Sequence, residues 1–580
     1  MLDFRSELET LVASYLADQG VSPETSPDLA LETPPDPEMG DLAVPCFPLA
    51  RVLRRPPNTI AADVAAFVAA RRPPWLAEVR AIGGYVNVRF QPSALAEDVI
   101  KAIEAAGERY GGGDAGRGKT VVIDFSSPNI AKPFSIGHIR STVIGHSLAR
   151  IYSSLGWRIV RVNHLGDWGT QFGKQIVAYK LWGAGVDLGT DAIEKLLQLY
   201  IRFHEEAETD PKLEEMARFW FKKLEDGDDE AVALWKRFRE LSLAEFRRVY
   251  DLLGIEFDAY TGESFYNDML ESTVRRVEEA GLTRVSNGAV IVPLDEYDLP
   301  PCLLKKTDGA TLYATRDIAA AIYRHNEYHF DRALYVVGMP QQLHFKQVFA
   351  TLAKLGEEWV ENCLHVPFGI IRYGDEVVST RRGNLIFLED VLTRAINMTR
   401  EIIERKNPDL PGKDEVARAV GIGAVVFADL RHNRVKDIDF SWDDVLNFEG
   451  DTGPYVQYSH ARACSVLRRA GVATLAPSVA ERGEVDVDWP ALHTREETEL
   501  LKKLAAFPEA VRAAAAEDEP STVARYLLDL CRDFNTFYHA HRVVGQEAGL
   551  ERARLRLVAA TRQVLANGLS LLGMDAPESM

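Results

Sequence analysis

The 580-residue chain has few cysteines, no excess of positive charge and no long apolar stretch. Its five cysteines are far apart and form no CxxC pair, which argues against a disulfide framework or a zinc site and favours a reducing compartment. The longest apolar run, residues 419–428, is about half as long as the ~20 residues that a membrane helix needs. The N-terminus carries Asp3, Glu7 and Glu9 and lacks the apolar core of a signal peptide. These absences predict a cytoplasmic protein that does not enter a membrane.

Negative charge dominates the composition. The formal net charge of −19 does not indicate a nucleic-acid partner, although local basic patches can still bind one. It also makes a membrane surface a poor partner. Apolar residues make up 46% and charged residues 26%, as in ordinary soluble globular proteins. At roughly 150 residues per domain, the length predicts about three to four domains.

Residues 1–112 predict a small N-terminal α/β domain. Apolar periodicity predicts helices over 6–18 and 59–70, and strict alternation predicts a strand over 84–90. The glycine-rich stretch 111–116 predicts the linker that ends this domain.

Residues 117–450 predict a domain built on a parallel sheet. The predicted elements are a strand at 119–125, a helix at 139–155, a strand at 158–163, a strand at 333–337 and a helix at 342–355. A strand, helix and strand in succession form a unit with a right-handed crossover, and such units make parallel sheets. Residues from about 175 to 300 include long charged helices and predict a helical insertion into this domain.

Residues 451–580 predict an all-helical C-terminal domain that is far less acidic than the rest of the chain. Its arginines, Arg462 among them, are accompanied by aromatic residues such as Tyr455 and Tyr458. Basic side chains beside rings that can stack suit single-stranded RNA. The alternative is that these residues are solvated helix faces and core rings.

The strongest chemical signal is the polar loop between the first strand and the first helix of the predicted sheet. Ligands of open α/β sheets bind at the carboxyl ends of the strands, and a helix N-terminus offers free N–H groups to phosphate. Gly137 has no Cβ, so a flat purine can lie against the backbone, and Lys132 and His138 can donate to phosphate oxygens. A plain surface turn does not account for so long a loop that combines Lys, Asn and His.

This loop resembles the "HIGH" element of class I aminoacyl-tRNA synthetases, and the chain as a whole resembles the arginyl-tRNA synthetases. The runs that carry the resemblance are 127–133 (Ser-Pro-Asn-Ile-Ala-Lys-Pro), 135–138, 163–173, 262–264, 312–319, 341–345, 455–462 and 577–580. They extend over essentially the whole chain, and the Asp-Trp-Gly-Thr-Gln-Phe-Gly run at 167–173 is highly specific to this family.

The resemblance implies an α/β fold: a parallel Rossmann-type catalytic sheet domain with a helical insertion, a small N-terminal α/β domain and an all-helical C-terminal domain. It also implies a role for each outer domain. The N-terminal domain would contact the D-loop of tRNA, and the C-terminal domain would bind the anticodon.

Two departures from the family pattern affect the phosphate contacts. Ser135 stands where the first histidine of HIGH usually stands, and a hydroxyl can hydrogen-bond phosphate but cannot be cationic. The "KMSKS" loop corresponds to 377–381 and lacks both lysines, which leaves Ser379 and Arg381 as its candidates for ATP. The resemblance implies that Lys132 stands in for the missing cation.

The implied reaction is the ATP-dependent attachment of L-arginine to its cognate tRNA through arginyl-adenylate, with release of AMP and pyrophosphate. The attacking groups belong to the substrates, so no protein nucleophile is needed. The implied catalytic and ATP-binding residues are Lys132, Ser135, Gly137 and His138. Mg²⁺ would arrive with ATP as a substrate complex, and no permanent metal site is expected.

The arginine site must supply acceptors, because a guanidinium has five donors and no acceptor. The resemblance nominates Glu263, Tyr313, Asp317 and Gln341 for arginine, with Asn129 and His164 at its α-amino or carboxylate end. Tyr313 and Asp317 are four residues apart and would share one face of a helix, although an ordinary surface turn has the same spacing. Such a site rejects lysine without an editing domain, because lysine leaves buried acceptors unpaired.

The implied partners are tRNA(Arg), L-arginine and ATP, with a monomer as the expected state. The candidate tRNA contacts are Asn87 and Phe90 for the D-loop, and Tyr455, Tyr458 and Arg462 for the anticodon. The alternative function is a catalytically silent, synthetase-like RNA-binding paralogue, which Ser135 and the degenerate 377–381 loop motivate. Against it, all the nominated arginine ligands are present. A different nucleotidyl transferase seldom needs the C-terminal helices, and a cysteinyl enzyme would need a Cys/His zinc cluster.

Overall fold

The computed structural model of the chain describes residues 2–27, 29–130, 132–189, 191–307, 309–373, 376–377, 386–447, 450–472 and 487–580. The chain divides into two compact units. One comprises Met1–Gly111, Ser459–Glu509 and Tyr526–Asn567, and the other comprises Gly112–Tyr458, Ala510–Arg525 and Gly568–Met580. The domain boundaries proposed above, 1–112, 117–450 and 451–580, remain a prediction.

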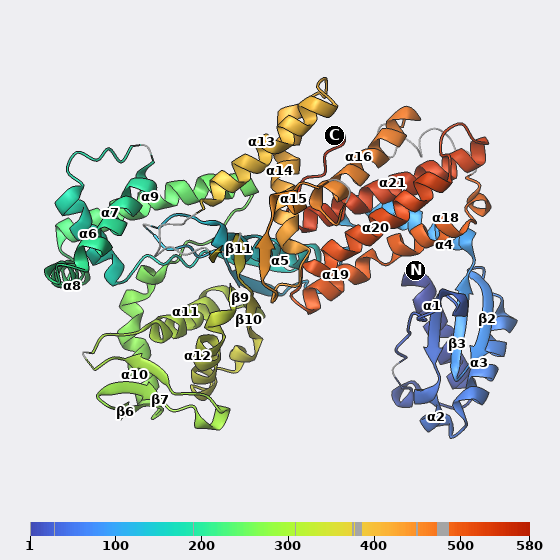
Figure 1. Cartoon of the computed structure of the whole chain (residues 1–580). Helices are drawn as coiled ribbons and strands as arrows, with labels where there is room; N and C mark the ends of the chain where they lie inside the picture. Colours follow the sequence, from blue (N-terminus) through green and yellow to red (C-terminus); the bar gives the residue numbers. More distant parts are fainter. Residues whose placement is uncertain are drawn as a thin grey trace. The chain divides into compact units, whose positions relative to one another are not determined.

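The N-terminal residues of the first unit form a three-stranded antiparallel sheet with the order β1-β3-β2. Its elements are α1 (Leu2–Asp18), β1 (Leu42–Pro45), α2 (Phe47–Leu53), α3 (Pro57–Arg71), β2 (Leu76–Ile82), β3 (Tyr85–Phe90) and α4 (Pro92–Ala106) (Figure 1). Gly83 and Gly84, with φ of 58° and 85°, join β2 to β3 in the tight turn that such φ values permit. The helices and the strand predicted for this region correspond to α1, α3 and β3.

The C-terminal region is helical, as predicted. Its helices are α16 (Gly453–Arg469), α18 (Arg495–Ala505), α19 (Phe507–Ala516), α20 (Ser521–Ala540) and α21 (Ala548–Leu571). Thr494 and Glu497 form a capping box at the start of α18, and Glu497 also accepts a hydrogen bond from Arg554 of α21 at 2.8 Å. Both partners of this ion pair are buried, so it ties the two helices together inside the first unit.

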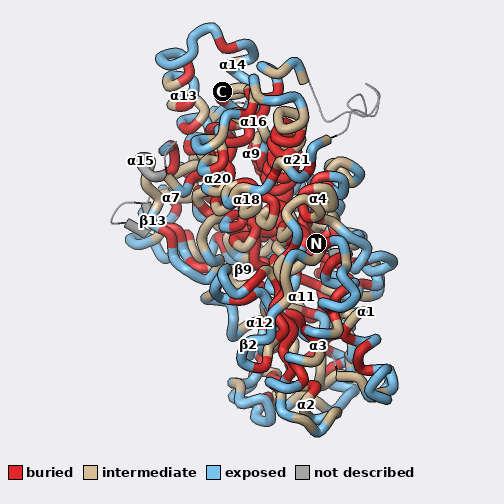
Figure 2. The backbone as a smooth tube through the Cα atoms, turned by 90° about the vertical axis from the view of Figure 1, so that its right-hand side faces the viewer, coloured by how far each residue is buried: buried red, intermediate tan, exposed pale blue. Residues whose placement is uncertain are grey.

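A four-stranded parallel sheet lies at the centre of the second unit, with the order β10-β9-β4-β5. The strands are β4 (Thr120–Asp124), β5 (Arg158–Val162), β9 (Arg332–Gly338) and β10 (Cys363–Phe368). Helix α5 (Ile139–Ser154) connects β4 to β5, and α12 (Gln342–Lys354) connects β9 to β10. Most residues of β4 and β9 are buried, as the red stretch of β9 in Figure 2 shows. The predicted parallel sheet is therefore confirmed.

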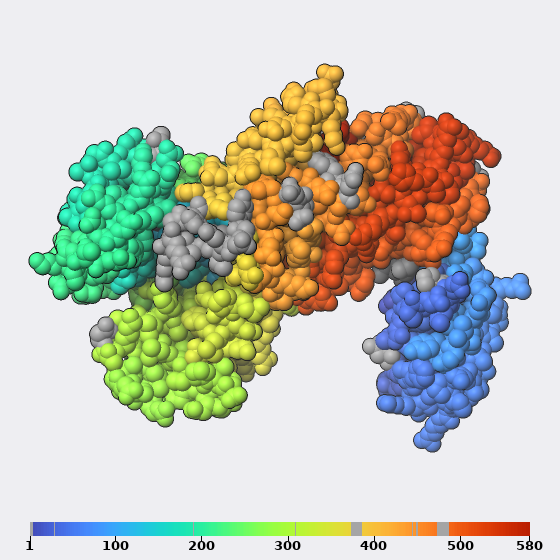
Figure 3. All heavy atoms as spheres, viewed as in Figure 1, coloured from blue at the N-terminus to red at the C-terminus, as the bar shows by residue number. Residues whose placement is uncertain are grey.

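The insertion contains the predicted helices, but it also contains a small sheet that the sequence analysis missed. The helices are α6 (Thr170–Trp182), α7 (Ala192–Ala207), α8 (Lys212–Glu225), α9 (Asp229–Leu253) and α10 (Leu270–Glu279). The strands β6 (Arg284–Ser286), β7 (Ala289–Val292) and β8 (Cys302–Lys305) pair antiparallel. Strands of three or four residues are too short for alternation to be recognised. In Figure 3 the α6–α8 region (teal) and the β6–β8 region (yellow-green) are separate bulges.

Helix α11 (Tyr313–Tyr328) precedes β9, and α13 (Leu388–Lys406), α14 (Lys413–Leu430) and α15 (Trp442–Val445) follow the parallel sheet. A second small sheet contains β11 (Ile371–Tyr373), β12 (Glu376–Val377) and β13 (Ile438–Phe440). The buried ion pair between Arg140 of α5 and Asp429 of α14, at 2.9 Å, joins the parallel sheet to these helices. All five cysteines are buried and free. No helix in the described ranges has the length and apolar character needed to cross a membrane.

Candidate functional site

The described residues that are nominated for ATP and arginine lie around the carboxyl edge of the parallel sheet. Asp124, the last residue of β4, is level with Val162 at the end of β5 and with Tyr335 in β9. The polar loop 125–135 therefore leaves the sheet beside the segment that begins at Asn163. This edge is where open parallel sheets bind their ligands.

The loop after β4 starts with two residues in the left-handed region, Ser126 (φ 68°) and Ser127 (φ 45°). Serine rarely adopts this conformation, and it persists where the surroundings impose it. Here the Ser126 N–H donates to Ser141 Oγ at 2.9 Å, and Ser126 Oγ lies 2.8 Å from both Thr142 Oγ1 and the Tyr250 hydroxyl. The network fixes how the loop enters α5.

Ser135 and His138 form a capping box at the turn that leads into α5. The Ser135 hydroxyl lies 3.2 Å from His138 Nδ1, and the Ser135 N–H lies 3.1 Å from the same atom. Burial, assisted by the positive charge of Lys132, lowers the pKa of His138 to about 4. His138 is therefore a neutral imidazole at pH 7. Gly137 between them is exposed, and among the described residues only Ser135 Oγ lies near its missing side chain.

The same turn is paired with the chain just after the degenerate KMSKS segment. The Ile136 N–H donates to the Ile386 carbonyl at 3.0 Å, and the Leu388 N–H donates to the Phe134 carbonyl at 2.9 Å. Ser379 and Arg381, the two ATP candidates of that segment, lie outside the described residues. The described chain that follows them thus runs beside the nominated phosphate-binding turn.

Asp317 lies between two histidines that come from other elements. Its Oδ2 is 2.5 Å from His344 Nε2, at the start of α12, and its Oδ1 is 3.9 Å from His164 Nε2, just after β5. Burial alone would raise the pKa of Asp317, but the His344 hydrogen bond and the positive charge of nearby groups, Arg324 among them, outweigh it and hold that pKa below its usual value. Asp317 is thus a carboxylate, and Tyr313 stands one turn before it in α11, largely exposed.

Glu263 provides a second acceptor close to Asp317. Its Oε2 is buried and has no hydrogen-bond partner among the described residues. Burial raises the pKa of Glu263 to about 7; the charges of Asp317 and Asp167 act in the same direction and that of Arg316 acts against it. Burying a carboxyl oxygen without a hydrogen-bond partner costs stability, so a ligand that donates a hydrogen bond to Glu263 Oε2 would offset that cost.

The sequence analysis missed the side chain that holds Glu263 in place. Asp167 is fully buried and accepts hydrogen bonds from the Ser264 N–H and hydroxyl, both at 2.8 Å, and from Arg239 Nε at 3.0 Å. A side chain at Gly262 would start 2.6 Å from Asp167 Oδ1, so only glycine fits there. His344 was also missed as a site residue. Both lie in the runs that carry the resemblance, which was the signal available.

Two further arginine candidates lie at the same edge. Asn129 is exposed and pairs with Gly166 in an isolated parallel bridge, where a Gly166 side chain would collide with the Asn129 amide. Gln341 is exposed and stands three residues before His344, at the end of the short helix Met339–Gln341. The structure thus brings Asn129 beside the segment that contains His164, and Gln341 beside the turn that contains His344.

The tRNA candidates differ in accessibility. Asn87 and Phe90 of β3 are only 5% and 2% exposed, and the Phe90 ring packs against Phe4 and Trp75. The packing therefore gives no support to a direct contact of these two side chains with a D-loop. Tyr458 of α16 is 40% exposed.

The other two candidates for the anticodon are less open. Tyr455 is half-buried. Arg462 donates to Asn535 at 2.5 Å and lies over the Tyr538 ring at 5.3 Å.

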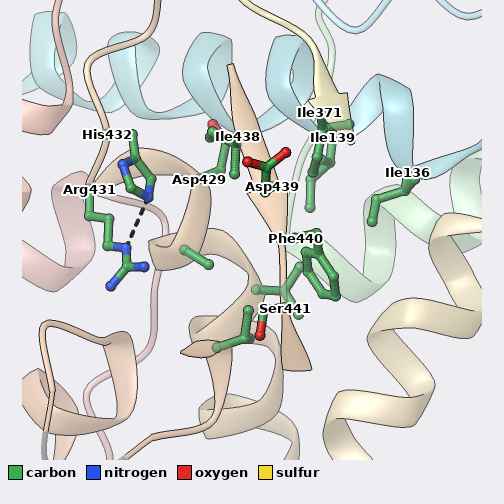
Figure 4. Close-up of a pocket in the computed structure, with 13 residues that line it drawn as sticks. Ile136, Ile139, Ile371, Asp429, Arg431, His432, Ile438, Asp439, Phe440 and Ser441 are labelled. Atoms are coloured by element: carbon green, nitrogen blue, oxygen red, sulfur yellow. Dashed lines mark hydrogen bonds between the residues drawn. The ribbon is translucent and has the colours of Figure 1, made fainter. Parts of the chain in front are cut away.

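A pocket adjoins the turn nominated for phosphate binding. Ile136, Ile139 and Ile371 form its apolar side, and Arg431, His432 and Asp439 lie around the rest, as Figure 4 shows. Its cavity volume is about 20 Å³. The buried Asp429, which pairs with Arg140, is also part of its lining. Within the described part of the chain, no group of three or more His, Cys, Asp or Glu side chains is placed to hold a metal ion.

Comparisons with known proteins cover the whole chain. Family models described as "tRNA synthetases class I (R), catalytic domain", "DALR anticodon binding domain" and "Arginyl tRNA synthetase N terminal domain" match residues 99–442, 456–580 and 6–90. An arginine–tRNA ligase of Clostridium perfringens is 49% identical over 551 residues, which is 95% of this chain and 96% of that protein. One of Halothermothrix orenii is 47% identical over 580 residues, all of both chains. The solved arginyl-tRNA synthetase of Thermus thermophilus is 28% identical, with a TM-score of 0.82 over 99% of this chain and all of that one.

Proposed function

Because the chain belongs to the class I arginyl-tRNA synthetases, we propose that it attaches L-arginine to its cognate tRNA at the edge formed by β4, β5 and β9. In the first step the arginine carboxylate attacks the α-phosphorus of ATP, which gives arginyl-adenylate and pyrophosphate. In the second step the terminal ribose 2′-OH of the tRNA attacks the adenylate carbonyl and releases AMP. The site then acts by positioning and by charge stabilisation.

ATP binds at the turn between β4 and α5 in this proposal. The residues assigned to it are Lys132, Ser135, Gly137 and His138, with Ser379 and Arg381 from the segment before Ile386. Of the residues that the structure describes, only Ser135 Oγ is near the missing side chain of Gly137, which suits a flat purine. The neutral His138 hydrogen-bonds the phosphate without adding charge. Positive charge comes from Lys132, and Mg²⁺ accompanies ATP as part of the substrate.

Arginine binds where the acceptors converge. The observation that carries the proposal is the pair of carboxyl groups at one place: Asp317 is ionised, and the buried Oε2 of Glu263 has no described hydrogen-bond partner. The guanidinium of arginine has several N–H donors in one plane, and these can hydrogen-bond both carboxyl groups. Tyr313 and Gln341 are assigned to the same site. Asn129 holds the other end of the amino acid.

The protein is strongly acidic overall, so binding of the negatively charged tRNA depends on a local basic patch. Affinity falls with added salt, because each phosphate contact releases counterions. Tyr455, Tyr458 and Arg462 are the proposed anticodon contacts. The proposed working unit is a monomer, acting in the cytoplasm where tRNA serves translation.

Arginine-dependent ATP–pyrophosphate exchange in the presence of tRNA(Arg) tests this function. The unaltered protein is expected to catalyse exchange, and Asp317→Asn is expected to raise the KM for arginine about 10- to 100-fold, because it removes one charged hydrogen-bond acceptor. Glu327→Gln, which changes an exposed carboxylate of the same helix, is the matched control and is expected to be neutral. No exchange at high concentrations of the unaltered protein would favour the silent RNA-binding paralogue instead.

A further inference from the structure

The protonation state of His164 follows from its partner on the far side of the ring. His164 Nδ1 lies 3.1 Å from the Thr261 carbonyl oxygen, which can only accept a hydrogen bond. Nδ1 must therefore carry the proton. Burial, and the positive charge of Arg324, lower the pKa of His164, although the nearby carboxylates of Asp124, Asp317 and Asp167 oppose this. The ring is then neutral, and its Nε2 presents a lone pair.

That lone pair points toward another acceptor. Nε2 of His164 and Oδ1 of Asp317 are 3.9 Å apart, which is too far for a hydrogen bond and leaves two acceptors facing each other. The other oxygen of Asp317 is occupied by His344, whose Nε2 must donate because a carboxylate only accepts. The two histidines therefore differ: His344 donates a hydrogen bond to Asp317, and His164 does not.

The His164 ring is held in this orientation from several sides. Its backbone N–H donates to Ser127 Oγ at 3.1 Å, and its ring contacts the Tyr266 ring with centroids 5.6 Å apart. The Ser127 hydroxyl in turn donates to Asp124 Oδ1 at 2.9 Å, and Asp124 pairs with the buried Arg324 at 2.8 Å. The position of Nε2 is thus set by β4, β5 and α11 together.

We propose that His164 is a specificity-determining residue of the arginine site: its Nε2 accepts an N–H of the guanidinium, beside Asp317 and Glu263. The inference rests on the proposed function and assigns His164 to the side-chain end of the substrate rather than to its α-amino or carboxylate end. A neutral acceptor adds a hydrogen bond without adding a third negative charge. Two carboxyl groups and one imidazole nitrogen then match a cation whose donors are spread over a plane.

Removing and restoring the acceptor tests the proposal. His164→Phe keeps a ring against Tyr266 but has no acceptor, and it is expected to raise the KM for arginine about 10- to 100-fold while the KM for ATP stays unchanged. His164→Gln can place an amide oxygen near the position of Nε2, and it is expected to keep the arginine KM within about threefold. His329→Asn, at an exposed residue with φ of 48° that asparagine tolerates, is the control and is expected to behave as the unaltered protein.

A spectroscopic measurement covers the case in which a variant fails to fold. In the unaltered protein with ¹⁵N-labelled histidine, the proposal predicts the Nδ1–H tautomer for His164 and a shift of its Nε2 resonance when arginine is added. The opposite tautomer, or an Nε2 signal that arginine does not move, would overturn it. So would an unchanged arginine KM in His164→Phe. If the unaltered protein neither binds arginine nor catalyses exchange, the proposed function itself fails, and that result is distinct from the others.

Discussion

His344 Nε2 donates to Asp317 Oδ2 across 2.5 Å, and the other oxygen of Asp317, Oδ1, is 3.9 Å from His164 Nε2. His344→Ala is expected to raise the KM for arginine about tenfold, because the carboxylate loses its orientation and a charge-assisted hydrogen bond. His344→Gln retains a donor and is expected to recover most of the affinity. Steady-state exchange kinetics at saturating ATP measure both, and equal KM values for the two variants would contradict this role.

Glu263 is expected to make arginine binding depend on pH near neutrality. Its pKa of about 7 means that the carboxyl group is protonated and neutral below pH 7, and a neutral acid attracts a guanidinium weakly. The KM for arginine is expected to rise as pH falls from 8 to 6, by up to about tenfold per pH unit below 7. In Glu263→Gln the KM is expected to be high and nearly flat over this range. The same slope in the variant would show that another group titrates.

In the absence of ligand, the raised pKa of Glu263 makes the stability of the folded protein change with pH in the opposite direction: stability falls as pH rises. A carboxyl group whose pKa is higher in the folded protein stabilises it at low pH, and that contribution is lost as pH rises through about 7. Above pH 7, Glu263→Gln is therefore expected to unfold at a higher temperature than the unaltered protein in the absence of arginine. Thermal unfolding followed by circular dichroism at pH 6 and pH 8.5 measures the difference, which should be larger at pH 8.5.

Gly262 is expected to be sensitive to the smallest substitution. An alanine Cβ would lie 2.6 Å from Asp167 Oδ1, and both the loop and the buried Asp167 would have to shift. Gly262→Ala is expected to lower kcat/KM for arginine at least tenfold through displacement of Glu263. Gly113→Ala, whose Cβ would meet only Leu155 at 3.9 Å, is the matched control. Full activity of Gly262→Ala would mean that the position of Glu263 is unimportant.

The buried pair of Arg140 and Asp429 is expected to matter for stability. Asp429→Asn leaves the Arg140 guanidinium buried beside a neutral group and should cost about 3–5 kcal/mol. Asp414→Asn, on the same helix α14, breaks a surface pair with Arg400 and should cost less than about 1 kcal/mol. Chemical unfolding of the two variants compares them. An equal effect would show that the charge of Arg140 is satisfied by other groups, such as the Lys436 carbonyl at 2.7 Å.

Local patterns predicted the elements that flank the proposed nucleotide site. The strand before Ser126, the helix after His138 and the following strand each have a periodicity that is complete within a dozen or so residues. The alternation of apolar residues in the strand Tyr85–Phe90 also predicts which of its side chains are buried. Phe90 shares a face of its strand with Val86 and Val88, both fully buried, so its place in the core could have been read from the spacing.

The contacts around the proposed arginine site could not be predicted from sequence pattern. Asp167 and Ser264 are 97 residues apart, and no periodicity connects two loops over that distance. The tautomer inferred for His164 depends on the backbone carbonyl oxygen of Thr261. Every residue has such an oxygen, so the amino-acid sequence does not reveal this contact. The resemblance supplied the residues of the site, and only the folded chain supplies which of them donate and which accept.

A crystal structure of the protein with L-arginine bound is the most direct test of the central claim. The account predicts one guanidinium with N–H groups within hydrogen-bond distance of Asp317 and Glu263, at the edge that also carries the turn of Ser135 and His138. A guanidinium bound elsewhere, with the Glu263 carboxyl still lacking a donor, would contradict it.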